Sequence, residues 1–282
     1  MIIDIHTHVG IMKSWSPYLI GHVRATVLDL ISYMDRVGVD IAVLLPLPGR
    51  IEPDTIIPGT EKVIRLSKEY PDRIIPFCVV DPRGIKVKEK VERYVKMGCR
   101  GLGEYKVPLP IDDRRSVSIF KLCADLGIPI LVHMDNRFNP DIRRFISVLN
   151  EVPDAVFIMH GPGWWKHISA NVDEKTDYPK GKVIPGGLIE KIFCEYKNVY
   201  ADISAYSGLN ALRRDPEYSK SFISRFSDRL LYGTDFPGIS PEGNQFGPNK
   251  AHLNLIKNLG LDMNIVDNVL YKNALRILDI HV

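Results

Sequence analysis

The regular alternation of short apolar runs with amphipathic stretches is the feature that most restricts the fold of this chain. Eight apolar runs predict strands, at residues 1–5, 39–45, 74–80, 99–104, 128–133, 155–160, 199–203 and 230–235. A helix after each strand is typical of a parallel sheet, and eight such units indicate closure into a (β/α)8 TIM barrel of the α/β class. An open sheet is the alternative that the same pattern leaves.

The predicted helices are recognised by apolar residues that recur three and four positions apart. They span residues 26–37, 60–70, 86–97, 115–126, 141–149, 188–196 and 208–226, with two more from residues 250 and 263. Gly38, Gly98 and Gly127 follow three of them, and glycine is common just beyond a helix C-terminus. The alternation breaks once, at residues 161–187 after the sixth strand. A segment of that length is usually functional or disordered.

The length of 282 residues suits one such barrel, and no linker or low-complexity tract divides the chain, so we expect a single domain over residues 1–282. The formal charge of +3 is dispersed, which argues against nucleic acid or an anionic membrane as the main partner. Neither a signal peptide nor a membrane span is predicted, and we expect a cytoplasmic protein. The cysteines show no CxxC pairing and are predicted to be reduced core thiols: Cys78, Cys99, Cys123 and Cys194.

Polar residues end six of the eight predicted strands, and the C-terminal ends of barrel strands form the active site of such folds. They are His6 and His8, Glu104, His133, His160, Asp202 with Ser204, and Asp235. Burying four imidazoles together with carboxylates costs several kcal/mol for each group that is unpaired, and a cation satisfies them together. The pattern therefore predicts a divalent metal site at the mouth of the barrel.

His6 and His8 carry the strongest local signal, because side chains two positions apart on a strand point to the same face. Two imidazoles held by one strand suit a divalent ion. The remaining histidines carry less weight. His22, His252 and His281 are predicted to be surface or packing residues, whereas His167 lies in the long segment, which can present it to the site.

Several of these residues together resemble a known family, the amidohydrolase superfamily of metal-dependent barrels. The similarity rests on Asp4-x-His6-x-His8, Glu104, His133, His160 and Gly233-Thr234-Asp235, and it extends to residues 273–278 in the closing helix. Residues 158–163 and 232–237 are most similar to the amidohydrolase-related branch. That branch includes hydrolases, lactonases and decarboxylases of aminocarboxymuconate semialdehyde and hydroxybenzoates.

The resemblance implies that His6, His8, His133 and Asp235 bind zinc or a similar divalent ion. It implies that His160 is either a ligand of a second ion or a base that contacts the substrate. Glu104 stands where many relatives have a bridging carboxylated lysine and some a glutamate. We expect Glu104 to be a metal ligand, and both one ion and two remain open.

The expected activity is hydrolysis of a small amide, ester or lactone, because a divalent ion lowers the pKa of bound water from about 15.7 toward 7. Asp235 would take the proton, and His160 would stabilise the developing negative charge. Non-oxidative decarboxylation of a small unsaturated or aromatic acid is the alternative, with Asp235 or His160 delivering a proton to carbon. A barrel that binds metal and ligand without turnover is a third hypothesis.

Aromatic and cationic residues near the strand ends are candidate contacts for a small-molecule substrate. They are Trp164, Trp165 and Lys166 of the long segment, Trp15 and Tyr18 of the first loop, and Lys106 and Arg137 after the fourth and fifth strands. The aromatic residues are predicted to wall the pocket, and the cations to hold a substrate carboxylate. A homodimer is the default expectation for the assembly.

Overall fold

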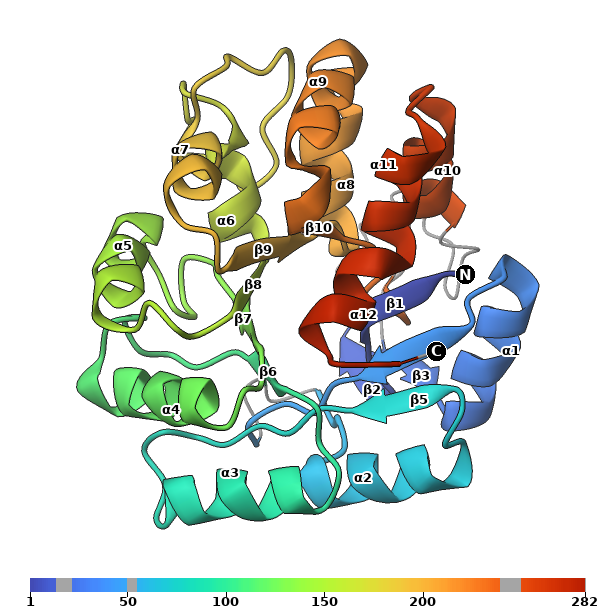
Figure 1. Cartoon of the computed structure of the whole chain (residues 1–282), viewed down its shortest axis with the longest axis vertical. Coiled ribbons are helices and arrows are strands. Elements are labelled where there is room, and N and C mark those ends of the chain that lie inside the picture. The colour runs from blue at the N-terminus through green and yellow to red at the C-terminus, as the bar shows by residue number, and fades with distance from the viewer. Residues whose placement is uncertain (14–21, 50–54, 239–249, 282) are drawn as a thin grey trace.

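Eight parallel strands close into a barrel that helices surround in the computed structural model, which describes residues 1–13, 22–49, 55–238 and 250–281 (Figure 1). The strands are β1 (Ile3–Thr7), β4 (Ile41–Leu44), β5 (Ile74–Pro76), β6 (Leu102–Tyr105), β7 (Ile130–His133), β8 (Phe157–His160), β9 (Val199–Asp202) and β10 (Leu230–Leu231). They form two parallel sheets, β1-β4-β5 and β10-β9-β8-β7-β6. Parallel bridges from Cys78 to Leu102 and from Thr7 to Phe236 join the sheets. The predicted (β/α)8 barrel is therefore confirmed.

Helices follow the strands largely as predicted. They are α1 (Val27–Val37), α2 (Thr60–Glu69), α3 (Val87–Lys96), α4 (Arg114–Asp125), α5 (Ile142–Glu151), α7 (Leu188–Glu195), α8 (Ala205–Arg213), α9 (Pro216–Phe226), α10 (Lys250–Asn258), α11 (Met263–Asp267) and α12 (Asn273–Ile277), with a π-helical turn η3 (Asn268–Lys272) before α12. A capping box between Thr26 and Asp29 begins α1, and Gly38 ends it with a left-handed φ of 79°.

Three sequence-based expectations need correction. The single helix predicted over residues 208–226 is two helices, because Pro216 starts α9 and the Asp215 side chain caps it. The long segment is not all loop, since it begins with α6 (Pro162–Trp165) and the 3-10 turn η1 (Lys166–Ile168). All four cysteines are free thiols, but Cys194 is exposed rather than in the core.

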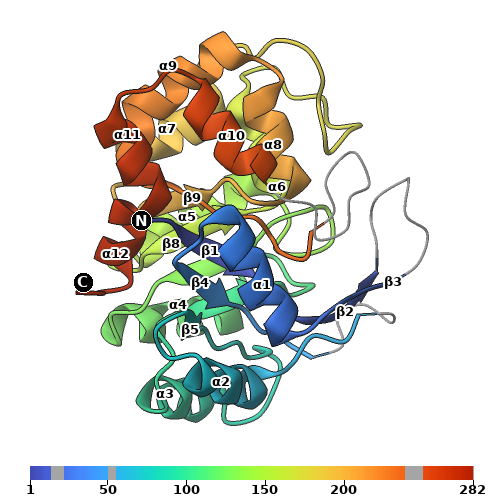
Figure 2. The ribbon, with the colours of Figure 1, turned by 90° about the vertical axis from the view of Figure 1, so that its right-hand side faces the viewer.

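An antiparallel hairpin that the sequence did not predict, β2 (Gly10–Lys13) and β3 (His22–Ala25), follows β1 directly. Figure 2 shows it projecting beyond the C-terminal end of β1. Ile11 also bridges to Ile56, so the hairpin is tied to the loop that follows β4. Each strand has four residues, too few for a clear alternation in the sequence.

An apolar cluster fills the inside of the barrel beneath the predicted site. It is formed by Ile3, Ile5, Val43, Leu45, Phe77, Leu131, Ile158 and Leu231, with Ala274 and Leu278 of the C-terminal region closing the end opposite the site. A larger cluster packs the outer faces of the strands against the helices. The polar strand ends therefore lie directly above packed apolar side chains, so water can reach them only from the mouth of the barrel. No helix among the residues that the structure describes is both long and apolar enough to cross a membrane.

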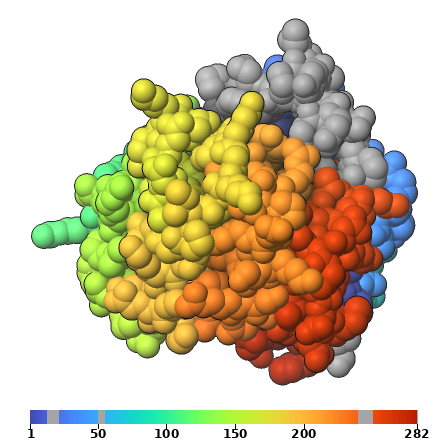
Figure 3. Space-filling model, turned by 90° about the horizontal axis from the view of Figure 1, so that it is seen from above, coloured from blue at the N-terminus to red at the C-terminus, as the bar shows by residue number. Residues whose placement is uncertain are grey.

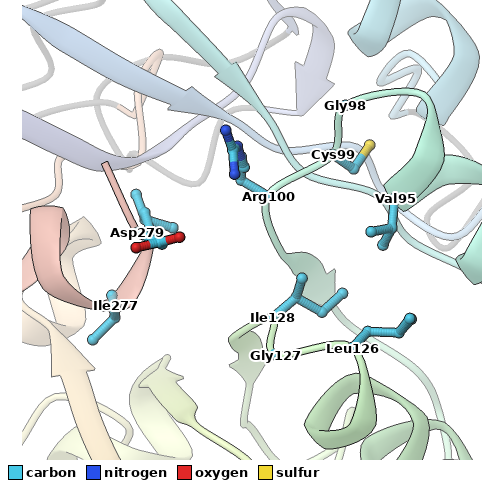
Figure 4. A pocket seen from close by; sticks show the side chains of 10 residues that line it. Val95, Gly98, Cys99, Arg100, Leu126, Gly127, Ile128, Ile277 and Asp279 are labelled. Atoms are coloured by element: carbon cyan, nitrogen blue, oxygen red, sulfur yellow. The ribbon is translucent and has the colours of Figure 1, made fainter. Parts of the chain in front are cut away.

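A cavity of about 430 Å³ lies at the end of the barrel where the strands begin, away from the polar strand ends. The turns before β6 and β7 line it together with the end of α12, and Arg100 and Asp279 contribute its charged side chains (Figure 4). Both of these side chains are exposed, and none of the histidines of the predicted site lines the cavity. It is therefore separate from the candidate metal centre.

Candidate metal centre

His6 and His8 turn the same ring nitrogen toward each other at the end of β1. His6 Nδ1 lies 2.9 Å from Asp202 Oδ2, and His8 Nδ1 lies 2.9 Å from the carbonyl oxygen of Leu45. Both partners only accept hydrogen bonds, so each Nδ1 donates its hydrogen and each Nε2 of a neutral ring is a bare lone pair. The two Nε2 atoms are 3.1 Å apart. Two lone pairs at this distance repel each other unless a cation or proton lies beside them.

Asp235 supplies a third donor to the same point. Its Oδ1 lies 3.5 Å from His6 Nε2 and 3.6 Å from His8 Nε2. Tetrahedral zinc with bonds of about 2.0–2.2 Å sets neighbouring ligand atoms roughly 3.4 Å apart, so the three separations fit one ion. The Asp235 backbone amide donates a hydrogen bond to the His6 carbonyl at 2.9 Å, and Asp235 has a left-handed φ of 59°. Such a conformation is uncommon outside glycine and often occurs at functional sites.

Glu104 connects this group to His133. Glu104 Oε2 lies 3.3 Å from His8 Nε2, and Oε1 lies 2.7 Å from His133 Nδ1. The His133 Nδ1 contact lacks hydrogen-bond geometry, and this buried nitrogen has no other partner, whereas His133 Nε2 pairs with Asp135 Oδ2 at 2.9 Å. A bare nitrogen and a carboxylate oxygen thus face each other closely. Like the His6–His8 pair, this donor arrangement suits a cation.

His160 completes the ring of imidazoles from the end of β8. Its ring centroid lies 4.3 Å from that of His6 and 5.3 Å from that of His133. Two groups of closely spaced donors result, and they share His6: one is His6, His8 and Asp235, and the other is His6, Glu104 and His160. The structure thus brings together every residue that the sequence predicted for metal binding and catalysis: His6, His8, Glu104, His133, His160 and Asp235. Because His6 has one bare nitrogen, it can bind an ion in only one of the two groups, and the donors leave both one ion and two open.

The crowding of acids and imidazoles shifts their protonation. Burial raises the pKa of Glu104, but His133 and His8 outweigh it and hold that pKa well below its usual range. Burial lowers the pKa of His160, yet Asp202 and further carboxylates raise it to about 9. Burial likewise opposes ionisation of Asp202, and the histidines that contact it keep its pKa far below the usual value. The site therefore holds buried anionic carboxylates that attract protons or a metal ion.

Asp4 ties the two chain segments of the first donor group together. Its carboxylate accepts hydrogen bonds from Thr234 Oγ1 at 2.6 Å, from the Thr234 amide at 3.1 Å and from the His6 amide at 3.1 Å. Burial is the main reason that the pKa of Asp4 rises to about 7. Because Thr234 immediately precedes Asp235, Asp4 sets the position of Asp235 relative to β1.

A family model for the amidohydrolases matches residues 3–280. The chain belongs to the amidohydrolase family. A comparison with curated proteins found no match.

Several solved structures have the same fold. An uncharacterized TIM-barrel protein from Bordetella bronchiseptica is 19% identical with a TM-score of 0.70, and the match covers 99% of this chain and 98% of that one. A 5-carboxyvanillate decarboxylase from Sphingomonas paucimobilis is 15% identical with a TM-score of 0.65. A probable 2-pyrone-4,6-dicarboxylic acid hydrolase from Acinetobacter baumannii, with citric acid bound, is 15% identical with a TM-score of 0.64. Both of these matches cover 99% of each chain.

Lys106 and Arg137 both reach the rim of this amidohydrolase site. Lys106 Nζ lies 5.2 Å from the ring centroid of Phe138, and Arg137 Cζ lies 4.8 Å from it. The Phe138 ring in turn contacts His133 with centroids 6.3 Å apart. Two cations and an aromatic ring therefore lie next to one of the candidate ligands.

The tryptophans of the long segment are not brought to the opening, which corrects the expectation for Trp164. Its ring is fully buried and packs between Phe145 and Phe193, with centroid distances of 6.3 and 6.0 Å. Trp165 is also buried and donates its indole hydrogen to the Asp202 carbonyl at 2.9 Å. Lys166 is paired with Glu174 at 2.9 Å. Trp15 and Tyr18 lie outside the described residues.

Tyr178 is an aromatic residue of the long segment that no pattern in the sequence singles out. Burial and then Asp177, Asp235 and Asp135 raise its pKa to about 12. Its ring lies 4.9 Å from that of Tyr206 on α8. The Asn210 side chain on α8 donates to the Pro179 carbonyl at 3.0 Å. The segment 169–187, yellow in Figure 3, is thereby fixed beside α8.

The histidines outside the site have other surroundings. They are His22, exposed on β3; His252, buried with Nε2 2.8 Å from the Ala205 carbonyl; His281, exposed near the C-terminus; and His167, buried in η1. The surface or packing roles predicted for the first three are confirmed. His167 is not part of either donor group.

His167 is expected to make the fold sensitive to acid. Burial is the main reason that its pKa falls to about 4, with Lys166 and Arg143 adding to the effect. A histidine whose pKa is lowered by folding stabilises the protein fully above about pH 6.5, and this contribution is lost as the pH falls toward 4. His167→Gln should therefore lose about 1–2 kcal/mol less of its unfolding free energy than the wild type over this range.

Thermal and urea unfolding from pH 7 to pH 4 measure this difference. His281→Gln is the matched control, because the His281 side chain is 91% exposed and its replacement should leave the pH dependence unchanged. Equal pH dependence in His167→Gln and the wild type would contradict the prediction.

Proposed function

We propose that this amidohydrolase is a metal-dependent hydrolase of a small ester, lactone or amide. The observation that carries the proposal is the donor arrangement, in which the bare Nε2 atoms of His6 and His8 face each other at 3.1 Å with Asp235 Oδ1 beside both. A divalent ion held by these residues, with Glu104 and His133 next to it, would make water acidic enough to supply hydroxide near neutral pH.

Asp235 is suited to move protons because it is the open member of the group. Its side chain is 31% exposed, whereas those of His6, His8 and Glu104 are between 0% and 6% exposed. Asp235 can therefore accept a proton from an attacking water and return it to the leaving group as that group departs. The other carboxylate, Glu104, is enclosed by histidines and stays in place as a ligand.

His160 is suited to stabilise negative charge. Asp202 raises the pKa of His160 to about 9 against the effect of burial, which favours the doubly protonated ring at neutral pH. One nitrogen is held by Asp202, which leaves the other to donate a hydrogen bond to the oxygen that gains charge when the carbonyl is attacked.

A small molecule that also carries a carboxylate is the substrate class that the rim supports. Lys106 and Arg137, which both lie beside the buried Phe138 ring, provide cations for a substrate carboxylate. The two relatives with named activities, a pyrone dicarboxylic acid hydrolase and a carboxyvanillate decarboxylase, act by their names on compounds of this kind.

Decarboxylation is the second candidate, and the protonated His160 favours it. When the bond between the ring carbon and the carboxyl group breaks, carbon dioxide leaves and the carbon keeps the electron pair. His160 can then give that carbon its proton. The same side chains serve both reactions, so the products must distinguish them.

The test is a product assay on the protein loaded separately with zinc and with manganese. Lactones, esters and amides of small aromatic acids are supplied beside hydroxybenzoates, while acid release and carbon dioxide release are followed in parallel. Hydrolysis predicts acid without carbon dioxide from the first set. Carbon dioxide from hydroxybenzoates would establish the second candidate in its place, and no turnover of either set would contradict both.

Removing the rim cations is expected to weaken substrate binding more than turnover. Lys106→Met and Arg137→Gln should each raise KM about 10-fold and change kcat less than about 3-fold, because a charge-assisted hydrogen bond contributes to bound and activated substrate alike. Lys121→Met is the matched control, since Lys121 is on α4 and pairs with Glu151. An unchanged KM in both rim variants would place the substrate carboxylate elsewhere.

A further inference from the structure

Asp202, at the end of β9, contacts two histidines of the candidate metal centre with its two oxygens. Oδ2 lies 2.9 Å from His6 Nδ1, and Oδ1 lies 2.9 Å from His160 Nδ1. The side chains of Asp202 and His6 are fully buried, and that of His160 is 3% exposed. One carboxylate therefore joins His6, which both donor groups share, to His160, which is proposed to stabilise negative charge on the substrate.

We infer that Asp202 is a positioning residue that fixes His6 and His160 together, with Nδ1 protonated and Nε2 directed at the site. An ionised carboxylate accepts hydrogen bonds and cannot donate them, so both Nδ1 atoms must supply the hydrogen. The inference rests on the proposed metal site and adds a residue that acts on it only through its ligands.

The orientation of His6 agrees with this role. Its Nε2 lies 3.1 Å from His8 Nε2 and 3.5 Å from Asp235 Oδ1, so the nitrogen that Asp202 leaves bare is the one that faces the other donors. If the hydrogen moved to Nε2, it would occupy the point at which the donors converge. Metal binding would then require the ring to change its tautomer first.

Asp202 is itself held rigidly. Its Oδ1 accepts the Ser204 hydroxyl at 2.6 Å and the Ser204 amide at 3.0 Å, and its carbonyl accepts the Trp165 indole hydrogen at 2.9 Å. Ser204 Oγ also lies 2.9 Å from His160 Nδ1. These bonds come from the start of α8 and from α6, so Asp202 is fixed from both sides and can hold two rings without moving.

Replacing the Asp202 carboxylate with an amide distinguishes a positioning role from a role in packing alone. Asp202→Asn keeps the size of the side chain but turns an NH2 donor toward one of the two Nδ1 atoms, which forces that ring into the other tautomer. Asp215→Asn is the matched control, because Asp215 is also a buried carboxylate that accepts backbone hydrogens, from Val183 at 3.0 Å and Tyr218 at 3.3 Å, but contacts no histidine of the site.

The first measurement is zinc affinity by competition with a chelator. Asp202→Asn should bind zinc about 10–100-fold more weakly than the wild type, whereas Asp215→Asn should remain within about 3-fold. Unchanged affinity in Asp202→Asn, or an equal loss in both variants, would overturn the inference. A wild type that binds no zinc at all would instead refute the proposed function, and the second measurement still decides the role of Asp202.

The second measurement needs no folded variant of Asp202. Two-bond proton–nitrogen spectra of the wild-type protein, with and without zinc, report which nitrogen of each histidine carries hydrogen, and His6→Gln and His160→Gln assign the signals. Both Nδ1 atoms are expected to be protonated and slow to exchange. A bare Nδ1 in either ring shows that Asp202 does not set its tautomer.

Discussion

Replacing His6 and His8 together with alanine is expected to leave the protein unable to retain a divalent metal and to lower its turnover at least about 10³-fold. The pair supplies two of the three donors in the first group, and His6 also belongs to the second. Asp235 alone would then face a solvent-filled gap on that side. Metal content per chain after dialysis, measured by inductively coupled plasma mass spectrometry, tests the loss of metal directly.

The matched control removes two histidines that lie outside the site. In His22→Ala with His281→Ala, both side chains come from exposed positions, so metal content and turnover should equal those of the wild type. Far-ultraviolet circular dichroism of the metal-free proteins checks that the barrel is intact in both double variants. Unchanged metal content in His6→Ala with His8→Ala would place the metal elsewhere in the protein.

The same measurement on the wild type decides what Glu104 does. Two ions per chain would fit a bridging role, because one Glu104 oxygen lies 3.3 Å from His8 Nε2 and the other lies 2.7 Å from His133 Nδ1. One ion would leave Glu104 as a single ligand or as an anion that orients the histidines. Both arrangements suit the donors, so stoichiometry rather than geometry separates them.

The grouping of the candidate metal ligands could be predicted from the sequence because these residues obey two simple rules. His6 and His8 share a face because strand side chains alternate, and the other ligands stand where strands end in a barrel whose strand ends share one opening. Neither rule depends on how loops pack. The order of the strands therefore brought Glu104, His133 and Asp235 together once the barrel was inferred.

The long segment could not be predicted in the same way, because its path depends on contacts with distant backbone. Gly161 and Gly163 pack so closely on Met134 that a Cβ would come within 2.5 and 2.9 Å of its backbone. This approach brings the segment onto the neighbouring loop and places Trp164 between helices instead of over the opening. Contacts with α8, from Tyr206 to Tyr178 and from Asn210 to the Pro179 carbonyl, hold the later part of the segment in place.

The role of Asp202 was also invisible in the sequence, although its position at a strand end was visible. A carboxylate at that position can bind a metal, a substrate or another side chain, and the choice depends on which groups lie within reach. The structure shows two imidazole nitrogens at 2.9 Å, which no spacing in the sequence encodes.

Asp235→Asn is expected to lower kcat about 10³–10⁴-fold while weakening metal binding only about 10-fold. The amide keeps an oxygen that can face His6 and His8, but it cannot accept a proton, and loss of a general base typically costs 10²–10⁴-fold, about as much as this proposal requires. KM should change less than about 3-fold, because the rim cations are untouched. Steady-state rates, compared with zinc affinity measured on the same preparations, separate proton transfer from metal binding.

Asp177→Asn provides the comparison for this variant, since Asp177 lies on the long segment and contacts Asn136 at 3.4 Å instead of the histidines. It should keep kcat within about 3-fold of the wild type. If Asp235→Asn lost metal and activity in equal proportion, Asp235 would be a ligand alone, and the proton would have to pass through His160. If it lost activity with its metal retained, Asp235 is the group that moves the proton. Among the residues that the structure describes, the only other carboxylate within 4 Å of both His6 Nε2 and His8 Nε2 is Glu104, whose side chain is 6% exposed.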